Sequence, residues 1–146
     1  MRVLCVCLGN ICRSPTAEAV LRSMAPDLVL DSAGTSGWHI GDPPYGPAIE
    51  AAAKRGYDLT PLRARAFVAE DFTRFDLILA MDSNNLADIE RLRPTGSPTK
   101  VSLFLDYADG HQGQDVPDPY YTRDFDGALD LVELAAEGLL RSLSRS

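Results

Sequence analysis

A short, unbroken apolar run opens the chain and limits what the chain can fold into. Val3–Cys7 (VLCVC) shows no alternation of polar and apolar side chains, and Gly9 follows shortly after it. Such a run is typical of a central strand in a parallel sheet, because helices cover both faces of that kind of sheet. The sequence therefore predicts a strand near its start that is buried on both sides.

Similar apolar runs alternate with segments of helical periodicity along the rest of the chain. Further strands are expected at 28–30, 77–81 and 101–105, and helices at 14–24, 47–54, 83–92 and 125–143. The last helix has one apolar stripe, with spacings of four and three: Phe125, Leu129, Val132, Ala136, Leu139 and Leu143. Alternating strands and helices predict an α/β sandwich with a mainly parallel sheet. A length of 146 residues fits one domain, residues 1–146.

Local residue types indicate where the elements start and end. Ser14 is expected to cap the first helix, Pro15 suits its first position, and Gly56 marks the end of the second. Two stretches, 35–46 and 106–121, lack regular periodicity and are rich in Gly, Pro, Asp and aromatic residues. Irregular loops of this length are often functional, so both are candidates for a binding site.

The chain is acidic, with 14 Lys and Arg against 21 Asp and Glu and a formal net charge of −7. This balance disfavours non-specific binding to nucleic acid or anionic lipid, so local positive charge must hold any anionic substrate. No stretch approaches the roughly 18 to 20 apolar residues of a membrane span. Gly9, Asn10 and Arg13 also interrupt the apolar run that most resembles a signal peptide. We therefore expect a cytoplasmic protein without a nucleic-acid or membrane partner.

The three cysteines, Cys5, Cys7 and Cys12, all lie within the first twelve residues. An odd number with no second cluster to pair with argues for a reducing compartment. Their spacing lacks the paired pattern of a zinc site, and His39 and His111 are isolated, so no metal is expected. The glycine motifs that bind nucleotides are missing as well, and we expect no cofactor. Cys5 lies inside the predicted strand and is expected to be a core residue.

The segment Cys7–Ser14 links the first strand to the first helix, at the carboxyl end of the strand. Ligands bind there in parallel α/β folds, and peptide groups that curl into a helix N-terminus can direct their N–H groups at one centre. Gly9 and Asn10 are the two residues that best tolerate a positive φ. Arg13 adds a planar fork of donors that matches phosphoryl oxygens. The expected phosphate-binding residues are Leu8, Gly9, Asn10, Ile11, Cys12, Arg13 and Ser14.

The same loop also acts on Cys7. A helix N-terminus and a nearby cation both stabilise a thiolate over a thiol. We therefore expect Cys7 to be ionised at neutral pH and to act as a nucleophile at the floor of an anion-binding cup.

The string CLGNICRSP at residues 7–15 resembles the signature loop of the low-molecular-weight protein tyrosine phosphatase family. VPDPYY at 116–121 is similar to the general-acid loop of this family, and SAGT at 32–35 and AMD at 80–82 are smaller matches. The resemblance therefore spans essentially the whole chain. It implies a three-layer domain, with a four-stranded parallel sheet flanked by helices on both faces, and hydrolysis of a tyrosine-phosphorylated protein. We expect a monomer.

The resemblance also implies roles for individual residues. Cys7 would attack phosphorus to form a cysteinyl-phosphate, while Arg13 and the loop amides bind the equatorial oxygens. Asp118 would protonate the leaving phenolate and then take a proton from water. Ser14 would hydrogen-bond the thiolate, and Asn10 would shape the loop. From the residues alone, Ser14 is also consistent with a plain helix cap, and the two roles can coexist. The spacing around Asp118 on its own favours a solvated turn carboxylate between two prolines.

Cys12 and four aromatic residues have further roles in the family. A cysteine at the position of Cys12 traps the oxidised nucleophile as a reversible disulfide, although Cys12 is also consistent with a small buried thiol. The family places the two irregular stretches around the pocket mouth, where aromatic walls suit a flat phenyl phosphate. These stretches contain Trp38, Tyr45, Tyr120 and Tyr121, which are alternatively scattered surface or packing residues.

Three other functions fit parts of this pattern. Arsenate reductases that share the scaffold need a pair of redox cysteines near residues 80–90, and no cysteine follows Cys12. Protein arginine phosphatases resemble the chain more closely but have threonine where Ile11 stands, so Ile11 favours a phenolic ester. A binding module without activity would lack the nucleophile or the acid, whereas Cys7 and Asp118 are both present.

Overall fold

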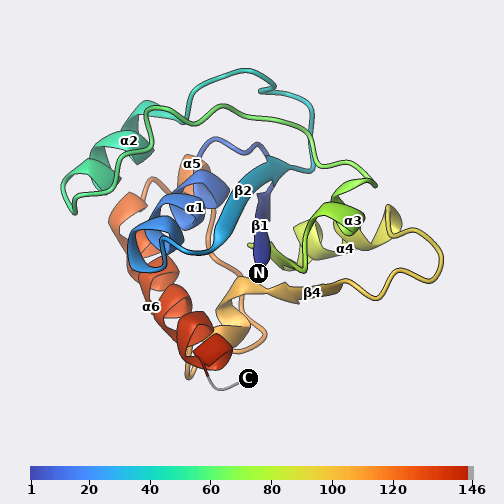
Figure 1. Cartoon of the computed structure of the whole chain (residues 1–146). Helices are drawn as coiled ribbons and strands as arrows, with labels where there is room; N and C mark the ends of the chain where they lie inside the picture. The colour runs from blue at the N-terminus through green and yellow to red at the C-terminus, as the bar shows by residue number, and fades with distance from the viewer. Residues whose placement is uncertain (145–146) are drawn as a thin grey trace.

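A four-stranded sheet with the order β2-β1-β3-β4 runs through the middle of the molecule (Figure 1). In this computed structural model, which describes residues 1–144, the strands are β1 (Arg2–Cys7), β2 (Val29–Gly34), β3 (Leu77–Ala80) and β4 (Lys100–Leu103). All three strand pairs are parallel, so the four carboxyl ends lie along one edge of the sheet. The predicted α/β fold with a four-stranded parallel sheet is confirmed.

The helices cover both faces of the sheet. They are α1 (Arg13–Met24), α2 (Gly46–Ala53), α3 (Asp71–Arg74), α4 (Ser83–Arg91), α5 (Pro119–Thr122), α6 (Phe125–Ser144) and the 3₁₀ turn η1 (Phe104–Tyr107). Val3 and Cys5 of β1 pack with residues of α1 and α6. Leu4 and Val6 of β1 pack on the opposite face with Phe72 of α3 and residues of β3 and α4. The first strand is therefore buried on both sides, as its apolar run predicts.

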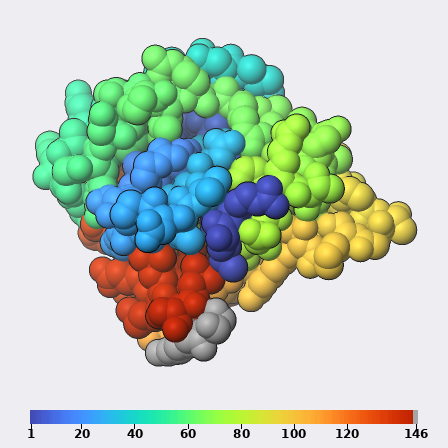
Figure 2. Space-filling model, viewed as in Figure 1, coloured from blue at the N-terminus to red at the C-terminus, as the bar shows by residue number. Residues whose placement is uncertain are grey.

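Figure 2 shows where the helices and loops lie on one face of the molecule. α1, in blue, lies between the green segment that follows α2 and the red α6. The loop between α4 and β4, in yellow, projects at the side of the molecule. Among residues 1–144, no helix combines the length and the apolarity that crossing a membrane requires.

The structure departs from the sequence prediction at the start of α1 and at the end of β4, and it contains two short helices that were not predicted. The helix α1 begins at Arg13, its N-cap residue is Cys12, and no side chain caps it, so the expectation that Ser14 caps this helix is wrong. Ser14 instead turns toward Cys7, and Thr16 donates to the carbonyl oxygen of Cys12 from both its N–H and its hydroxyl group. The predicted fourth strand ends early, because Phe104 and Leu105 turn into η1 and are buried there. The short helices α3 and α5 had no sequence signal long enough to predict them.

Candidate active site

The loop between β1 and α1 wraps around the sulfur of Cys7. The backbone N–H of Asn10 donates to Cys7 Sγ at 3.2 Å, and Ser14 Oγ lies 3.0 Å from the same sulfur. Asn10 has a φ of 57°, so it supplies the left-handed residue that the turn requires. The sulfur is therefore contacted by a backbone donor on one side and by a hydroxyl group on the other.

The carbonyl groups of this loop point away from its centre. The oxygens of Cys7, Leu8 and Ile11 accept hydrogen bonds from the N–H groups of Thr35, Ser36 and Tyr45, at 2.9, 2.9 and 2.8 Å. In a planar trans peptide, the N–H group points opposite to the preceding carbonyl. The N–H groups of Leu8, Gly9 and Cys12 therefore face the inside of the loop, where they can bind an anion.

Gly34 lets β2 approach this loop closely. A Cβ atom there would lie 2.9 Å from the carbonyl oxygen of Leu8 and 3.1 Å from the carbonyl carbon of Gly9. Both contacts are with backbone atoms, which cannot rotate away as a flexible side chain can. Gly34 thus allows the end of β2 to support the loop from behind.

Arg13 is the first residue of α1, and its side chain is buried beside the loop. Its Nη1 donates to Asp82 Oδ2 at 2.7 Å and to the carbonyl oxygen of Val116 at 2.9 Å. Its Nη2 lies 3.4 Å from Asp118 Oδ2, and its Nε makes no hydrogen bond with any residue that the structure describes. Nε and Nη2 form one edge of the guanidinium group, and that edge can bind two oxygens of a single ligand.

Charged neighbours keep Arg13 protonated. Burial lowers its pKa, but the nearby Cys7, the hydrogen bond to Asp82 and the charges of Asp118 and Asp82 outweigh burial, so the pKa of Arg13 is raised. A permanently charged guanidinium group therefore lies beside the Cys7–Ser14 loop, although the net charge of the protein is negative.

Asp118 reaches this site from the segment before α5. The N–H of Val116 donates to the carbonyl oxygen of Met81 at 2.8 Å, which attaches this segment to the end of β3. Asp118 is the N-cap of α5, since its Oδ1 accepts from the N–H of Tyr120 at 3.1 Å. Its Oδ2 faces Arg13, so the structure brings Cys7, Arg13 and Asp118 together from distant parts of the chain.

Cys7 and Asp118 line a cavity of about 140 Å³, whereas Asn10, Arg13 and Ser14 are not among its lining residues. Cys7, Leu8, Gly9, Ile11 and Cys12 form its floor. Trp38, His39, Asp118, Tyr120 and Tyr121 line its sides and mouth. The cavity therefore has a polar, anion-binding end and a largely aromatic entrance.

Tyr45 and His39 take different places at the cavity from those that the sequence indicated. Tyr45 does not line the cavity itself but packs against Tyr120, with ring centroids 5.1 Å apart. His39 lines the cavity and pairs with Asp42 across 3.2 Å, although the sequence indicated only an isolated histidine in a loop. Its place in the irregular stretch 35–46 was the one available signal.

A buried polar chain lies behind the loop. Asn10 Nδ2 donates to Ser14 Oγ at 2.7 Å and to Ser32 Oγ at 3.0 Å, and Ser32 Oγ donates to Glu18 Oε1 at 2.7 Å. Burial raises the pKa of Glu18, although hydrogen bonds from Ser32 and Arg22 oppose the rise. Ser32 and Asp82 belong to the matched strings SAGT and AMD, but no role was predicted for either residue.

Cys5, Cys7 and Cys12 are all free thiols in the structure. Cys5 is fully buried in the core, where burial raises its pKa. Burial and the nearby Cys7 raise the pKa of Cys12 to about 12, so Cys12 is a neutral thiol near neutral pH. Within residues 1–144, no group of three or more His, Cys, Asp or Glu side chains is placed to hold a metal ion.

Comparison with known proteins agrees with this geometry. Residues 2–146 match the family described as low molecular weight phosphotyrosine protein phosphatase. A low molecular weight protein-tyrosine-phosphatase of Streptomyces coelicolor is 46% identical, over 97% of this chain and 93% of its own length. The crystal structure of YfkJ from Bacillus subtilis has a TM-score of 0.93 and 38% identity, and it covers 99% of this chain and 95% of its own. A structure described as a Drosophila arginine phosphatase has a TM-score of 0.92 and 33% identity, with 98% of both chains covered.

A parallel α/β fold with a cysteine at the floor of an anion-binding loop defines a class of phosphate-ester hydrolases. The chain belongs to the low molecular weight phosphotyrosine protein phosphatase family, as its motifs predict. Members of this family are hydrolases, and a cysteine-based mechanism is typical of them.

Proposed function

We propose that this chain hydrolyses phosphotyrosine in proteins through a cysteinyl-phosphate on Cys7. One observation carries the proposal: Cys7 and Asp118 line one cavity with an aromatic mouth, and Arg13, whose Nε has no partner among the described residues, lies 3.4 Å from the Asp118 carboxyl group. The phosphoryl group binds at the floor of this cavity. The Nε–Nη2 edge of Arg13 and the N–H groups of the loop hold its equatorial oxygens.

The first chemical step transfers the phosphoryl group to sulfur. The thiolate of Cys7 attacks phosphorus as the bond to the phenolic oxygen breaks, and protonated Asp118 gives its proton to that oxygen. Before the attack, the N–H of Asn10 and the hydroxyl group of Ser14 stabilise the thiolate.

The second step releases phosphate. Asp118, now ionised, takes a proton from a water molecule as the water oxygen attacks phosphorus and the sulfur–phosphorus bond breaks. The electron pair returns to sulfur, where the same donors from Asn10 and Ser14 stabilise it again. The Cys7 thiolate and the proton on Asp118 are thereby restored.

The walls of the cavity support a phenolic substrate. Trp38, Tyr120 and Tyr121 can flank a phenyl ring, and Ile11 offers an apolar side chain without a hydroxyl group. The second candidate is protein arginine phosphatase activity, which the structural similarity to the Drosophila arginine phosphatase favours.

We also propose the oligomeric state, the partner and the compartment of the chain. Residues 1–146 serve as a single low-molecular-weight phosphatase domain, active as a monomer, because one chain supplies every group of the site. Its partner is a tyrosine-phosphorylated protein, and the net charge of −7 disfavours nucleic acid and anionic membranes. Three free cysteines support a reducing compartment such as the cytoplasm.

Turnover of four phosphate donors tests this proposal. Phosphotyrosine, an aryl phosphate, phosphoserine and phosphoarginine are each given to the native chain, to Cys7→Ser and to Asp118→Asn. We expect hydrolysis of the first two donors, no turnover by Cys7→Ser, and a rate about 10²- to 10⁴-fold lower for Asp118→Asn. A preference for phosphoarginine would establish the second candidate, and native rates from Cys7→Ser would refute the role of Cys7.

A further inference from the structure

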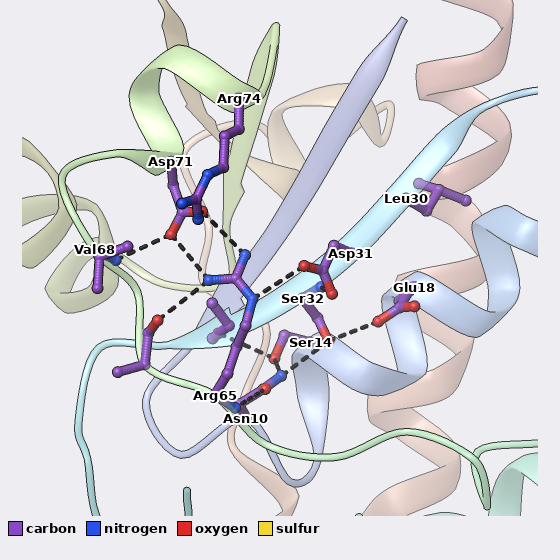
Figure 3. Close-up of polar contacts among 12 residues, drawn as sticks. Asn10, Ser14, Glu18, Leu30, Asp31, Ser32, Arg65, Val68, Asp71 and Arg74 are labelled. Carbon is purple, nitrogen blue, oxygen red and sulfur yellow. Dashed lines mark hydrogen bonds and ion pairs between the residues drawn. The ribbon is translucent and has the colours of Figure 1, made fainter. Parts of the chain in front are cut away.

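Arg65 joins two acidic residues that lie on different elements behind the active-site loop (Figure 3). Its Nε donates to Asp31 Oδ2 on β2 at 3.0 Å. Its Nη1 and Nη2 donate to the two carboxylate oxygens of Asp71 on α3, both at 3.1 Å. The side chain of Asp71 is fully buried, and it also accepts from the N–H of Val68 at 3.0 Å. The guanidinium group of Arg65 thus fixes its own segment to both neighbouring elements.

The main chain of Arg65 contacts the active-site loop directly. Its N–H donates to Asn10 Oδ1 at 3.0 Å, and its carbonyl oxygen accepts from the N–H of Gly34 at 2.8 Å. Arg65 lies in the irregular segment between α2 and α3, where Ala66 forms only an isolated bridge with Gly34. The carbonyl oxygen of Ala64 accepts from the N–H of Gly41 at 2.8 Å and so also helps to hold this peptide. The Arg65 side chain adds a further constraint on where its own N–H group points.

This N–H group determines how the side chain of Asn10 is oriented. A backbone N–H can only donate, so the oxygen of the Asn10 amide must face it. The Asn10 amide nitrogen then faces Ser14 and Ser32 and donates to both hydroxyl oxygens. Each hydroxyl group has one hydrogen left to give, and Ser32 gives it to Glu18. Ser14 has two acceptors in reach: Cys7 Sγ at 3.0 Å and the carbonyl oxygen of Ala33, which is farther away at 3.4 Å.

We propose that Arg65 is a positioning residue for the nucleophile, because its bridge between Asp31 and Asp71 fixes the N–H group that orients Asn10 and so directs the Ser14 hydroxyl hydrogen to Cys7. The inference rests on the proposed function, since it assumes that Cys7 reacts as a thiolate. Arg65 itself does not line the cavity and touches no substrate.

Substitution of Arg65 tests the proposal. Arg65→Met removes both ion pairs, whereas Arg65→Lys keeps the charge but cannot form the bidentate contact with Asp71 while reaching Asp31. For Arg65→Met we expect kcat on an aryl phosphate to fall about tenfold with KM within about twofold. Alkylation of Cys7 by iodoacetate at pH 6 should slow about threefold or more, because less of the sulfur is ionised. Arg65→Lys should lie between this variant and the native chain.

The matched control is Arg63→Met. Arg63 lies two residues away on the same segment, is exposed, and donates only to the carbonyl oxygens of Thr60 and Leu62. We expect its kcat and its alkylation rate to equal those of the native chain. The melting temperature of each variant is measured alongside, so that a loss of stability is recognised as such.

A double-mutant cycle with Ser14→Ala shows whether Arg65 acts through Ser14. If it does, Arg65→Met should add little to the loss of kcat and alkylation rate caused by Ser14→Ala. Fully additive losses, or Arg65 variants that lower only the melting temperature, would overturn the proposal. A native chain that does not hydrolyse aryl phosphate would instead refute the proposed function, and the alkylation rates would still decide the role of Arg65.

Discussion

The guanidinium group of Arg13 is fixed along one side by Asp82. Asp82 uses both of its carboxylate oxygens: Oδ2 accepts from Arg13 Nη1, and Oδ1 accepts from the N–H of Asn85 at 2.7 Å to cap α4. An asparagine is as good a helix cap as an aspartate, but when its amide oxygen caps α4, its NH2 group, which cannot accept a hydrogen bond, takes the place of the oxygen that faces Arg13. Asp82→Asn therefore weakens the contact with Arg13 but keeps a residue that caps α4.

We predict that Asp82→Asn lowers kcat/KM for an aryl phosphate about tenfold, because Arg13 loses a charged partner that fixes its free edge. Inorganic phosphate should also inhibit this variant more weakly. Asp88→Asn, on the outer surface of the same helix and paired only with Arg91, is the control and should retain native kinetics. Equal kcat/KM values for Asp82→Asn and the native chain would show that Asp82 does not position Arg13.

Cys12 gives a second prediction for a single residue. Peroxide converts the Cys7 thiolate to a sulfenic acid, and the Cys12 thiol can condense with it to form a disulfide and release water. Both cysteines line the same cavity, so we expect Cys12→Ser to retain turnover in reducing buffer. After peroxide treatment, a dithiol should restore the activity of the native chain but little of that of Cys12→Ser. Equal recovery would exclude the protective disulfide, and mass spectrometry of the native chain should detect the Cys7–Cys12 bond.

At the scale of elements, the carboxyl ends of β1 and β2 set the shape of the loop. Cys7 and Gly34 are register partners at the ends of these two strands. A side chain at position 34 would overlap with backbone atoms of Leu8 and Gly9, so either β2 or the loop would have to move.

We predict that Gly34→Ala lowers the free energy of unfolding by about 1–3 kcal/mol and lowers kcat about tenfold or more. Gly46→Ala is the matched control, because a Cβ there meets no atom within 4 Å at the start of α2. Urea unfolding and aryl phosphate turnover measure the two effects. If Gly34→Ala kept native turnover, the close approach of β2 would have no role in shaping the loop.

The contact between α6 and η1 affects stability alone. A Cβ at Gly138 of α6 would lie within bonding distance of the carbonyl oxygen of Tyr107, so an alanine forces the two elements apart. We predict that Gly138→Ala lowers the free energy of unfolding by about 1–3 kcal/mol or more, with KM unchanged because neither residue lines the cavity. Urea unfolding and steady-state kinetics check this, and a raised KM with native stability would contradict it.

The sequence predicted the elements whose own residues carry a clear apolar pattern. The buried run of β1 and the four–three spacing of α6 both gave correct elements, and Gly56 has the positive φ expected beyond a helix end. The four residues of α3 span barely one turn, which is too short for a period to be visible. The run at 101–105 indicated a longer strand, because apolar residues buried in a 3₁₀ turn look the same in sequence as strand residues.

The site was predictable only where its residues follow one another in the chain. The loop at 7–14 could be interpreted from its own residues, whereas the place of Asp118 depended on the family resemblance. The contacts that Asp82, Ser32 and Arg65 make with the loop lie between distant segments, as does the contact between Ser32 and Glu18. No local pattern encodes such contacts, because they arise when parallel strands bring their carboxyl ends together.

At the scale of the whole molecule, the net charge of −7 opposes the local charge of Arg13. We predict that a phosphotyrosine peptide with basic flanking residues gives a higher kcat/KM than the same peptide with acidic ones. The ratio should shrink as NaCl rises from 0.01 to 0.15 M, because the Debye length falls from about 30 to about 8 Å. Kinetics at both salt concentrations measure the ratio. If the ratio did not depend on salt, local contacts with the flanking residues, and not the net charge of the protein, would explain the preference for basic peptides.

The segment that carries Asp118 ends in an unusual backbone conformation. Arg123, which follows α5, has a φ of 64°, a value that glycine or asparagine adopts more readily. Its guanidinium group lies 5.3 Å from the ring centroids of both Tyr45 and Phe125, and it donates to the Tyr45 hydroxyl group. These two rings belong to the N-cap of α2 and the start of α6, so contacts with the helical layer outside the sheet hold the segment of Asp118, the proton donor of the proposed mechanism, in place. Evolutionary change in that layer can therefore adjust the rate of the acid-catalysed step without altering any residue that meets the phosphate.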